Sequence, residues 1–238
     1  MLYLIGLGLN EKGISLEGIE ACRKAEEVFL EGYTVDFPYK KEELEEIIGK
    51  KLKVLKREDV ESDKIVNLAG KKDIALLIYG SPLFATTHIA LVQMCLEKKI
   101  KHKIIYSASV FDAIAETGLQ LYKFGKTTSL PKWTEKHKPT SFVEVIKENQ
   151  GIKAHTLLLV DIGLEFSEAL KQIEKSDDGE VKLKEIIACS NLGTEKAKIF
   201  YGSIEKLKKK NIEKPFCLII PAELHFLELE FLENFRVK

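Results

Sequence analysis

The sequence lacks long apolar runs and lacks an excess of either charge. No apolar stretch approaches the roughly 20 residues that a membrane-spanning helix needs. The first nine residues, M-L-Y-L-I-G-L-G-L, have no basic region before them, so we interpret them as a core strand and not as a signal peptide. Lysine plus arginine and aspartate plus glutamate both number 37, and this balance argues against a general nucleic-acid binder. We expect a cytoplasmic protein with neither a membrane nor a nucleic acid as partner.

Cysteine pairs and metal-binding spacings are also missing. The four cysteines are far apart and form no C-x-x-C motif: Cys22, Cys95, Cys189 and Cys217. This usage predicts reduced thiols within apolar surroundings. The five histidines show no local spacing of the kind that holds zinc, so we expect no metal.

Three common catalytic or nucleotide-binding motifs are absent. The pair Gly6-x-Gly8 follows an apolar run, but Glu11 stands where a dinucleotide fingerprint needs its third glycine. No G-x-x-x-x-G-K-[ST] phosphate loop and no G-x-S-x-G nucleophile elbow occur. Ser81 has no base beside it in the sequence, and these absences leave phosphate-loop and serine-nucleophile chemistry without support.

What the sequence does contain is a prominent stretch from Asp73 to His88. It opens with the apolar run 74–79, which is typical of a buried parallel strand. Gly80-Ser81-Pro82 breaks this strand, and a helical pattern is predicted to start at Ala85. Open α/β sheets bind ligands where their strands end, so this stretch is either part of a ligand site or an ordinary strand-to-helix connection.

Strands and helices alternate through the first half of the chain, which predicts a mostly parallel α/β sheet. Ser15 is a plausible cap for the first helix, residues 52–55 are an edge-strand candidate, and a helix is predicted from Val110 to Leu121. The pattern then changes to that of a mixed sheet. We therefore predict an α/β protein of two α/β domains, 1–108 and 109–238.

Several segments together resemble one known family. Gly80 to His88 (GSPLFATTH) and Thr117 to Gly125 (TGLQLYKFG) are the most specific of them. The other matching segments occur at residues 6–9, 107–113, 138–142, 159–162 and 220–225. The series spans nearly the whole chain and is similar to the diphthine synthase branch of the tetrapyrrole methylases.

This resemblance implies a fold and an activity. The fold would be two α/β domains of tetrapyrrole-methylase type with S-adenosylmethionine bound in the cleft between them, and the chain would form a homodimer. The activity would be repeated methylation of the amino group of the 3-amino-3-carboxypropyl histidine of elongation factor 2, in diphthamide biosynthesis. Archaeal family members are expected to stop at the trimethylammonium product, whereas eukaryotic members add a methyl ester.

The resemblance also implies cofactor contacts, carried over position by position. They fall on Leu9, Ser81, Phe84, Ser109, Val110, Val160, Tyr201 and His225, with Leu192 as an alternative to Tyr201. Where the family usually has Gly-Asp-Pro, this chain has serine at position 81, and where it usually has Asn, this chain has Asp112. One hypothesis is that Asp112 partly restores the missing negative charge. The alternative is that Asp112 is a first-turn residue favoured by the helix dipole.

Methylation of an amine also requires that a proton be removed, because an aliphatic amine is mostly protonated at neutral pH. Asp161, His88 and His225 are the candidate bases, with a structural role as the alternative for each histidine. Two other functions stay open: a catalytically weak binding or regulatory homologue, and a methylase acting on a small tetrapyrrole or another amine. Lysines of the loop 123–136 are predicted either to meet an acidic protein substrate or to be solvated.

Overall fold

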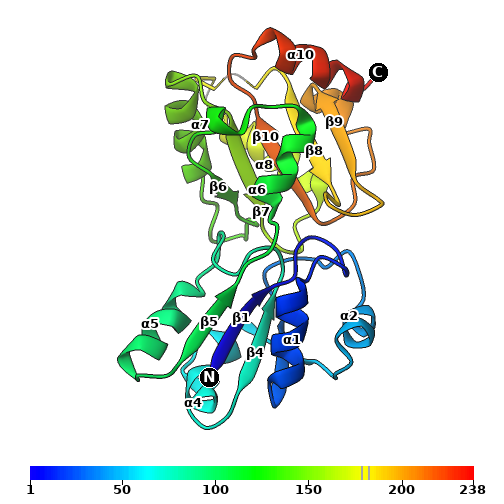
Figure 1. Ribbon diagram of the computed structural model, residues 1–238. Helices are drawn as coiled ribbons and strands as arrows, with labels where there is room; N and C mark the ends of the chain where they lie inside the picture. The colour runs from blue at the N-terminus through cyan, green and yellow to red at the C-terminus, as the bar shows by residue number, and fades with distance from the viewer. Residues whose placement is uncertain (178, 182) are drawn as a thin grey trace. The chain divides into compact units, whose positions relative to one another are not determined.

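The computed structural model describes residues 1–177, 179–181 and 183–238 (Figure 1). The chain divides into two compact units, Met1–Asp112 and Ala113–Lys238, each built on its own sheet. This mixed α/β architecture confirms the predicted fold class. The division lies a few residues after the boundary predicted at residue 108. No helix within the described residues is both long enough and apolar enough to cross a bilayer.

The first unit is built on a parallel sheet in the order β3-β2-β4-β1-β5. Its strands are β1 (Leu2–Gly6), β2 (Glu27–Glu31), β3 (Lys53–Leu55), β4 (Ile74–Ile78) and β5 (His102–Ile105). All residues of β4 are buried, as expected for a central strand of a parallel sheet that is covered on both faces. The short strand β3 lies at the edge, as predicted.

Helices cover both faces of this sheet. Side chains of α1 (Leu16–Lys24) and α2 (Lys41–Ile48) pack against one face. Side chains of α3 (Arg57–Val60), α4 (Lys64–Ala69) and α5 (Ile89–Glu97) pack against the other. The adjacent strands β1 and β4 therefore lead to helices on opposite faces. Their connections diverge where the strands end, and in open α/β sheets such a divergence forms a ligand crevice.

Local capping explains where several helices begin and end. The Ser15 hydroxyl accepts a hydrogen bond from the Gly18 N–H at 3.1 Å and caps α1, as predicted. The prediction of a helix from Ala85 is wrong, because Ala85 has a φ of +52° and α5 begins only at Ile89.

The prediction of one helix from Val110 to Leu121 is also wrong. The chain forms α6 (Val110–Ala113) and then a 3₁₀ turn, η1 (Ile114–Thr117). The Thr117 hydroxyl donates to the Ile114 carbonyl within this turn, and the turn ends at Gly118, whose φ of +78° stops a right-handed helix.

The second unit contains a mixed sheet, as predicted, and its strand order is β6-β7-β10-β8-β9. Among the strands that the structure describes in it, β6 and β7 pair in parallel and the other pairs are antiparallel. The strands are β6 (Thr128–Leu130), β7 (Thr156–Val160), β8 (Ile186–Ser190), β9 (Lys198–Gly202) and β10 (Phe216–Ile220).

Helices complete the second unit. One face of the sheet packs against α7 (Ser141–Gly151), α8 (Phe166–Ser176) and α9 (Ile204–Leu207). The short turn η2 (Leu121–Lys123) precedes β6, and α10 (Phe226–Leu232) and η3 (Glu233–Phe235) follow β10. The helix α10 lies directly on the turn at Gly118, because a Cβ added there would lie 2.3 Å from the Phe231 ring.

Three loops of the first unit meet at Gly6, so a side chain at this position should destabilise the protein. A Cβ at Gly6 would lie 2.6 Å from the Gly80 carbonyl oxygen and 3.0 Å from the Ser107 nitrogen. We expect Gly6→Ala to lower the free energy of unfolding by about 1–3 kcal/mol in urea denaturation. The control is Gly151→Ala at the end of α7, where a Cβ meets nothing within 4 Å. Equal stability of the two variants would contradict the close packing inferred at Gly6.

Candidate functional site

The carboxyl edge of the first sheet is held together by hydrogen bonds between its loops. The Gly80 N–H donates to the Gly8 carbonyl at 2.9 Å, and the Gly8 N–H donates back to Gly80 at 3.2 Å. Both glycines have φ near +70°, which favours glycine at these positions. The Tyr79 hydroxyl donates to the Leu9 carbonyl at 3.1 Å. These bonds place Leu9 beside the turn that contains Ser81.

The segment after β4 forms a tight turn at the same edge. The Phe84 N–H donates to the Ser81 carbonyl at 3.2 Å, which closes the turn around Pro82. Ser81 and Phe84 are half-buried. The Phe84 ring lies against Phe111, with ring centroids 5.2 Å apart. An aromatic pair beside a hydroxyl suits a ligand with both flat apolar and polar parts.

The loop after β5 adds a capping arrangement. Asp112 accepts from the Ser109 N–H at 2.6 Å and from the Ser109 hydroxyl at 3.0 Å, and the Ser109 hydroxyl accepts from the Phe111 N–H. Asp112 is therefore a capping residue of α6, as the helix-dipole alternative predicts. Its carboxylate also adds a negative charge at this edge. The structure thus brings together five of the predicted residues: Leu9, Ser81, Phe84, Ser109 and Val110.

The predicted residues of the second unit do not lie together. Val160 ends β7, and the antiparallel partner β10 begins beside it at Phe216. Tyr201 lies at the other end of the sheet, level with Ile187 on the neighbouring strand, and His225 follows the carboxyl end of β10. Val160 is therefore roughly 10 Å along the strands from Tyr201, at 3.3 Å per residue. The alternative residue Leu192 is buried.

The side chains of Tyr201 and His225 have partners within this unit. The Tyr201 hydroxyl donates to Glu185 at 2.5 Å, and the Arg236 guanidinium lies 4.6 Å from the centre of its ring. His225 caps α10 through its Nδ1, which accepts from the Leu227 N–H at 3.4 Å. Tyr201 also lines a hollow of about 540 Å³ with residues 221–224.

The candidate bases differ in exposure. Asp161 is exposed, and its two carboxylate oxygens accept from the N–H groups of Ile162 and Lys132 at 3.0 and 3.2 Å. His88 is 1% exposed. Burial lowers the pKa of His88, which weakens it as a base. No contact among the described residues assigns catalysis to Asp161 or His88, and the role of each as a base stays a prediction.

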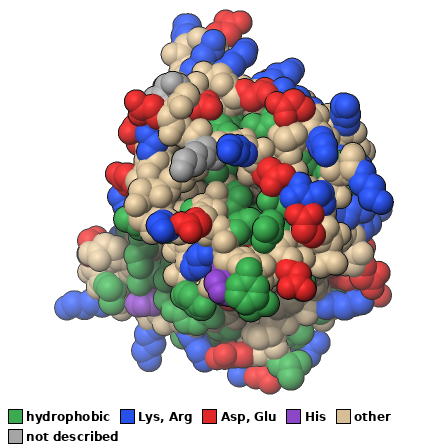
Figure 2. Space-filling view, turned by 90° about the horizontal axis from the view of Figure 1, so that it is seen from above, with side chains coloured by type: hydrophobic (Ala, Val, Ile, Leu, Met, Phe, Trp, Pro, Cys, Tyr) green, Lys and Arg blue, Asp and Glu red, His purple; other side chains and the backbone are tan. Residues whose placement is uncertain are grey.

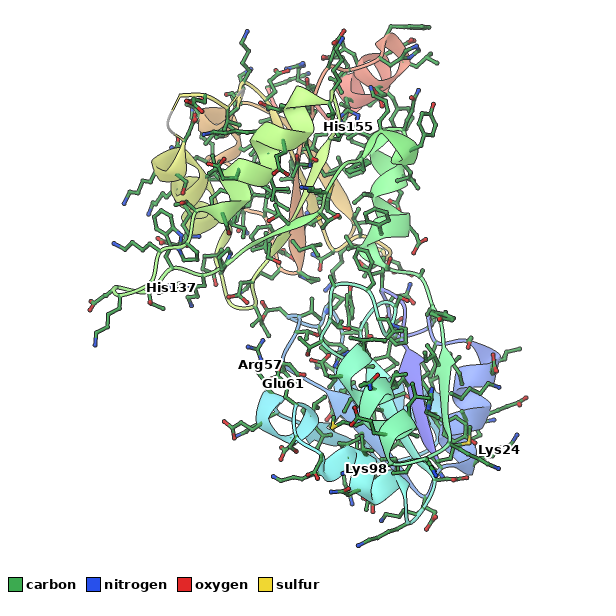
Figure 3. The ribbon with its side chains drawn as sticks, turned by 90° about the vertical axis from the view of Figure 1, so that its left-hand side faces the viewer. Lys24, Arg57, Glu61, Lys98, His137 and His155 are labelled. Carbon is green, nitrogen blue, oxygen red and sulfur yellow. The ribbon has the colours of Figure 1, made fainter. Side chains whose placement is uncertain are left out.

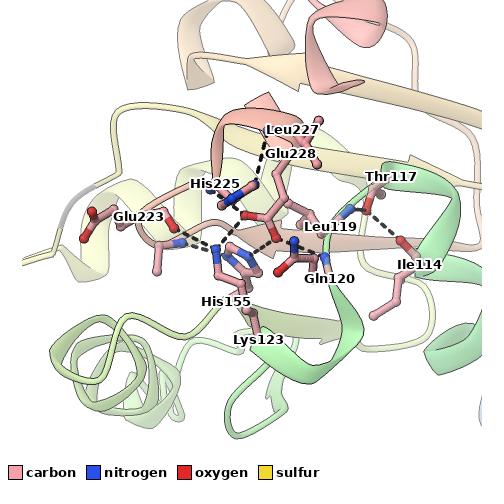
Figure 4. Close-up of polar contacts among 11 residues, drawn as sticks. Ile114, Thr117, Leu119, Gln120, Lys123, His155, Glu223, His225, Leu227 and Glu228 are labelled. Atoms are coloured by element: carbon pink, nitrogen blue, oxygen red, sulfur yellow. Dashed lines mark hydrogen bonds and ion pairs between the residues drawn. The ribbon is translucent and has the colours of Figure 1, made fainter. Parts of the chain in front are cut away.

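Sequence reasoning missed a buried ionic cluster in the second unit (Figure 4). Glu228 is 1% exposed and accepts from the Lys123 ammonium at 2.6 Å and from the N–H groups of Gln120 and His225 at 3.0 and 2.7 Å. His155, which precedes β7 and lies inside the unit (Figure 3), is 3.2 Å from Glu228 through its Nε2. This cluster joins α10 and β7 to the segment 117–125.

The hydrogen bonds of this cluster determine its protonation. The Ala222 N–H donates to His155 Nδ1 at 3.0 Å, so Nε2 carries the proton that His155 donates to Glu228. Burial lowers the pKa of His155, although Glu228 opposes the shift. Burial alone would raise the pKa of Glu228, but Lys123 and the N–H donors outweigh it and lower that pKa to about 2. The cluster at neutral pH is a carboxylate, an ammonium and a neutral imidazole.

One local signal could have revealed part of this cluster. The spacing His225-x-x-Glu228 is a capping box, in which the N3 carboxylate accepts from the cap N–H. Nothing local links Glu228 to Lys123, which is 105 residues away.

The lysines of the loop 123–136 were predicted either to be solvated or to face a substrate. Some of them have partners within the second unit: Lys126 pairs with Glu148, and Lys132 donates to the Gly163 carbonyl.

Comparisons with known proteins place this chain among methylases. The family described as Tetrapyrrole (Corrin/Porphyrin) Methylases matches residues 1–208. The chain is 37% identical to the diphthine synthase of Methanocaldococcus jannaschii, over 98% of each chain. It is 36% identical to the diphthine methyl ester synthase of Schizosaccharomyces pombe, over 100% of this chain and 95% of that one. A crystal structure of diphthine synthase superposes with a TM-score of 0.90 at 34% identity, covering 99% of this chain and 95% of the other.

The buried cluster predicts a specific acid sensitivity. Glu228→Gln removes the charge that Lys123 and His155 face, so we expect the free energy of unfolding at pH 7 to fall by about 3–5 kcal/mol. In the unsubstituted protein, the pKa of Glu228 is about 2 against 4.5 for an ordinary glutamate. The contribution of Glu228 to the free energy of unfolding is therefore complete above pH 4.5 and is lost as the pH falls towards 2. Because the pKa of His155 is lowered in the folded protein, the free energy of unfolding also begins to fall as the pH drops below 6.5.

Urea denaturation from pH 7 to pH 3 measures both effects. The matched control is Glu148→Gln, which removes an exposed carboxylate paired with Lys126 and should change stability by less than about 1 kcal/mol. A Glu228→Gln variant as stable as this control would show that the cluster contributes no net stability.

Proposed function

The chain belongs to the tetrapyrrole methylase family, and from this we propose that it is a methyltransferase of diphthamide biosynthesis that uses S-adenosylmethionine. Its substrate would be the amino group of the 3-amino-3-carboxypropyl histidine of elongation factor 2. The observation that carries the proposal is full-length similarity to relatives named diphthine synthase and diphthine methyl ester synthase. The segment Thr117–Gly125, which is one of the two most specific parts of the resemblance in the sequence, is held by Glu228.

The carboxyl edge of the first unit has groups that suit the methyl donor. The Phe84 and Phe111 rings offer an apolar surface for adenine, and the hydroxyl of Ser81 and the backbone after Gly8 and Gly80 offer hydrogen-bonding groups. The Asp112 carboxylate supplies negative charge that favours a sulfonium. In the second unit, Val160, Tyr201 and His225 stay predicted contacts. When bound, S-adenosylmethionine supplies an electrophilic methyl group, and the protein's part is to orient and deprotonate the amine.

The amine must lose its proton before each attack, and exposure separates the candidate bases. Asp161 and His225 are exposed, whereas His88 is buried. An exposed carboxylate or imidazole can exchange protons with water between methyl transfers, which repeated methylation requires. We therefore favour Asp161 or His225 over His88 for this step.

Two further properties belong to this proposal. A homodimer is supported by exposed apolar side chains on α10 and η2: Tyr122, Phe226, Leu227, Leu229 and Phe231. Figure 2, which looks onto the part of the surface that contains α10, shows hydrophobic side chains among charged ones. Apolar exposure of this kind is typical of protein–protein contacts. We also propose a cytoplasmic location, since elongation factor 2 acts there.

A second candidate function is that of a catalytically weak, donor-binding homologue. The observation that favours it is Ser81, which stands where the family usually has aspartate. Loss of a carboxylate next to a cationic cofactor would weaken binding. The two functions differ in whether methyl groups reach the protein substrate.

Transfer of labelled methyl groups tests the proposed function directly. We expect label from S-adenosylmethionine on elongation factor 2 that carries the unmethylated precursor, and no label on factor that lacks the modified histidine. Mass spectrometry of the modified peptide then counts the methyl groups and separates the trimethylammonium product from the methyl ester. Donor binding without any label on the factor would favour the second function.

Asp112→Asn tests whether this charge contributes to donor binding. An asparagine oxygen can still accept from the Ser109 N–H, so the cap is kept while the charge is lost. We expect calorimetry at low salt to show S-adenosylmethionine binding about two- to fivefold more weakly, with a smaller difference at high salt. Unchanged affinity at low salt would refute the hypothesis that Asp112 replaces the missing family carboxylate.

A further inference from the structure

The Pro82 carbonyl is the centre of the turn that follows β4. It accepts from the Thr86 hydroxyl at 2.9 Å and lies 3.2 Å from His88 Nδ1. The Thr86 hydroxyl also accepts from the His88 N–H at 3.4 Å. Two side chains from the segment Ala85–His88 thus bond one carbonyl that lies within the turn from Ser81 to Phe84.

These contacts define the state of His88. A carbonyl can only accept, so His88 Nδ1 must carry the proton. His88 Nε2 is buried and has no hydrogen-bond partner among the described residues. A second proton at Nε2 would therefore be a buried charge without an acceptor. Burial lowers the pKa of His88, although the hydrogen bond to Pro82 and the charge of Glu61 oppose the shift. The imidazole is a neutral donor.

The backbone beside this carbonyl needs such support. Ala85 has a φ of +52°, a conformation that a residue with a Cβ rarely adopts. Such a conformation persists only where surrounding contacts hold it. The hydrogen bonds that close over Ala85 run from Thr86 and His88 to the Pro82 carbonyl. Ser81 and Phe84 lie at the two ends of the turn that these hydrogen bonds support.

We propose that His88 is a positioning residue that, together with Thr86, holds the Pro82 carbonyl and so presents Ser81 and Phe84 to the methyl donor. This inference rests on the proposed function, because it assigns the turn to donor binding. It gives His88 a role that does not require proton transfer. The buried imidazole acts through Pro82 and touches neither donor nor substrate.

Substitutions at His88 separate positioning from base catalysis. The Nδ2 of asparagine occupies the place of the imidazole Nδ1, so His88→Asn keeps the donor to Pro82, whereas His88→Leu keeps bulk and loses it. We expect His88→Leu to weaken S-adenosylmethionine binding about three- to tenfold by calorimetry, since it loses one hydrogen bond. We expect His88→Asn to remain within about twofold of the unsubstituted protein.

Threonine variants provide a matched pair. Thr86→Val removes the hydroxyl that donates to the Pro82 carbonyl beside His88, and it should weaken donor binding by a similar factor. Thr87→Val removes the hydroxyl of the exposed neighbouring residue and should leave binding unchanged. Hydrogen exchange of residues 81–88 should be faster in His88→Leu and Thr86→Val than in Thr87→Val.

Kinetics give the remaining readout. Positioning predicts that His88→Leu raises KM for the donor with kcat within about twofold, and that His88→Asn restores KM. An equal loss of kcat in both His88 variants with unchanged donor affinity would overturn the proposal in favour of a base. Unchanged affinity in both His88→Leu and Thr86→Val would overturn it as well. If the unsubstituted protein binds the donor but methylates no elongation factor 2, the proposed function fails. The donor affinities of the variants would then still test whether His88 positions the turn.

Discussion

The two hydrogen bonds between Gly8 and Gly80 are the contact on which the first unit's candidate site depends. They join the connections of β1 and β4, which then lead to helices on opposite faces of the sheet. Without these bonds, the two connections would separate where β1 and β4 end, and their backbone would not line this edge of the sheet. Glycine at both positions permits the left-handed backbone that this approach needs. Ser81 follows this junction directly, and Ser109 lies beside Gly80.

In the second unit, a buried ionic cluster places α10 against the segment 117–125, where the first unit uses a backbone contact. Glu228 is buried with an ammonium, a neutral imidazole and two N–H donors around its oxygens. Removing one partner from such a group leaves a buried charge that is costly. The arrangement therefore specifies one position for α10 against the segment that ends at Gly125. Both units rely on a few polar contacts to place loops that their apolar cores alone would leave undefined.

Much of the fold could be predicted from the sequence. The apolar run at Ile74–Ile78, the cap at Ser15 and the edge position of β3 follow from local patterns. The start of α5 could not be predicted, because the helical pattern continues back to Ala85 although the backbone of Ala85 is left-handed. The end of the helical segment at Gly118 was not predicted either, because the helical pattern continues beyond this residue to Leu121. Glu228 was missed because its partners Gln120 and Lys123 are more than a hundred residues away in the sequence.

The distance in sequence between Glu228 and its partners has a consequence for synthesis of the chain. Gln120 and Lys123 are translated more than a hundred residues before the carboxylate that they bind. The segment around them and the imidazole of His155 leave the ribosome with their polar groups still hydrated. They can dehydrate at a small free-energy cost only once α10 has been made. The burial of these polar groups therefore waits for α10, which is translated after all of them.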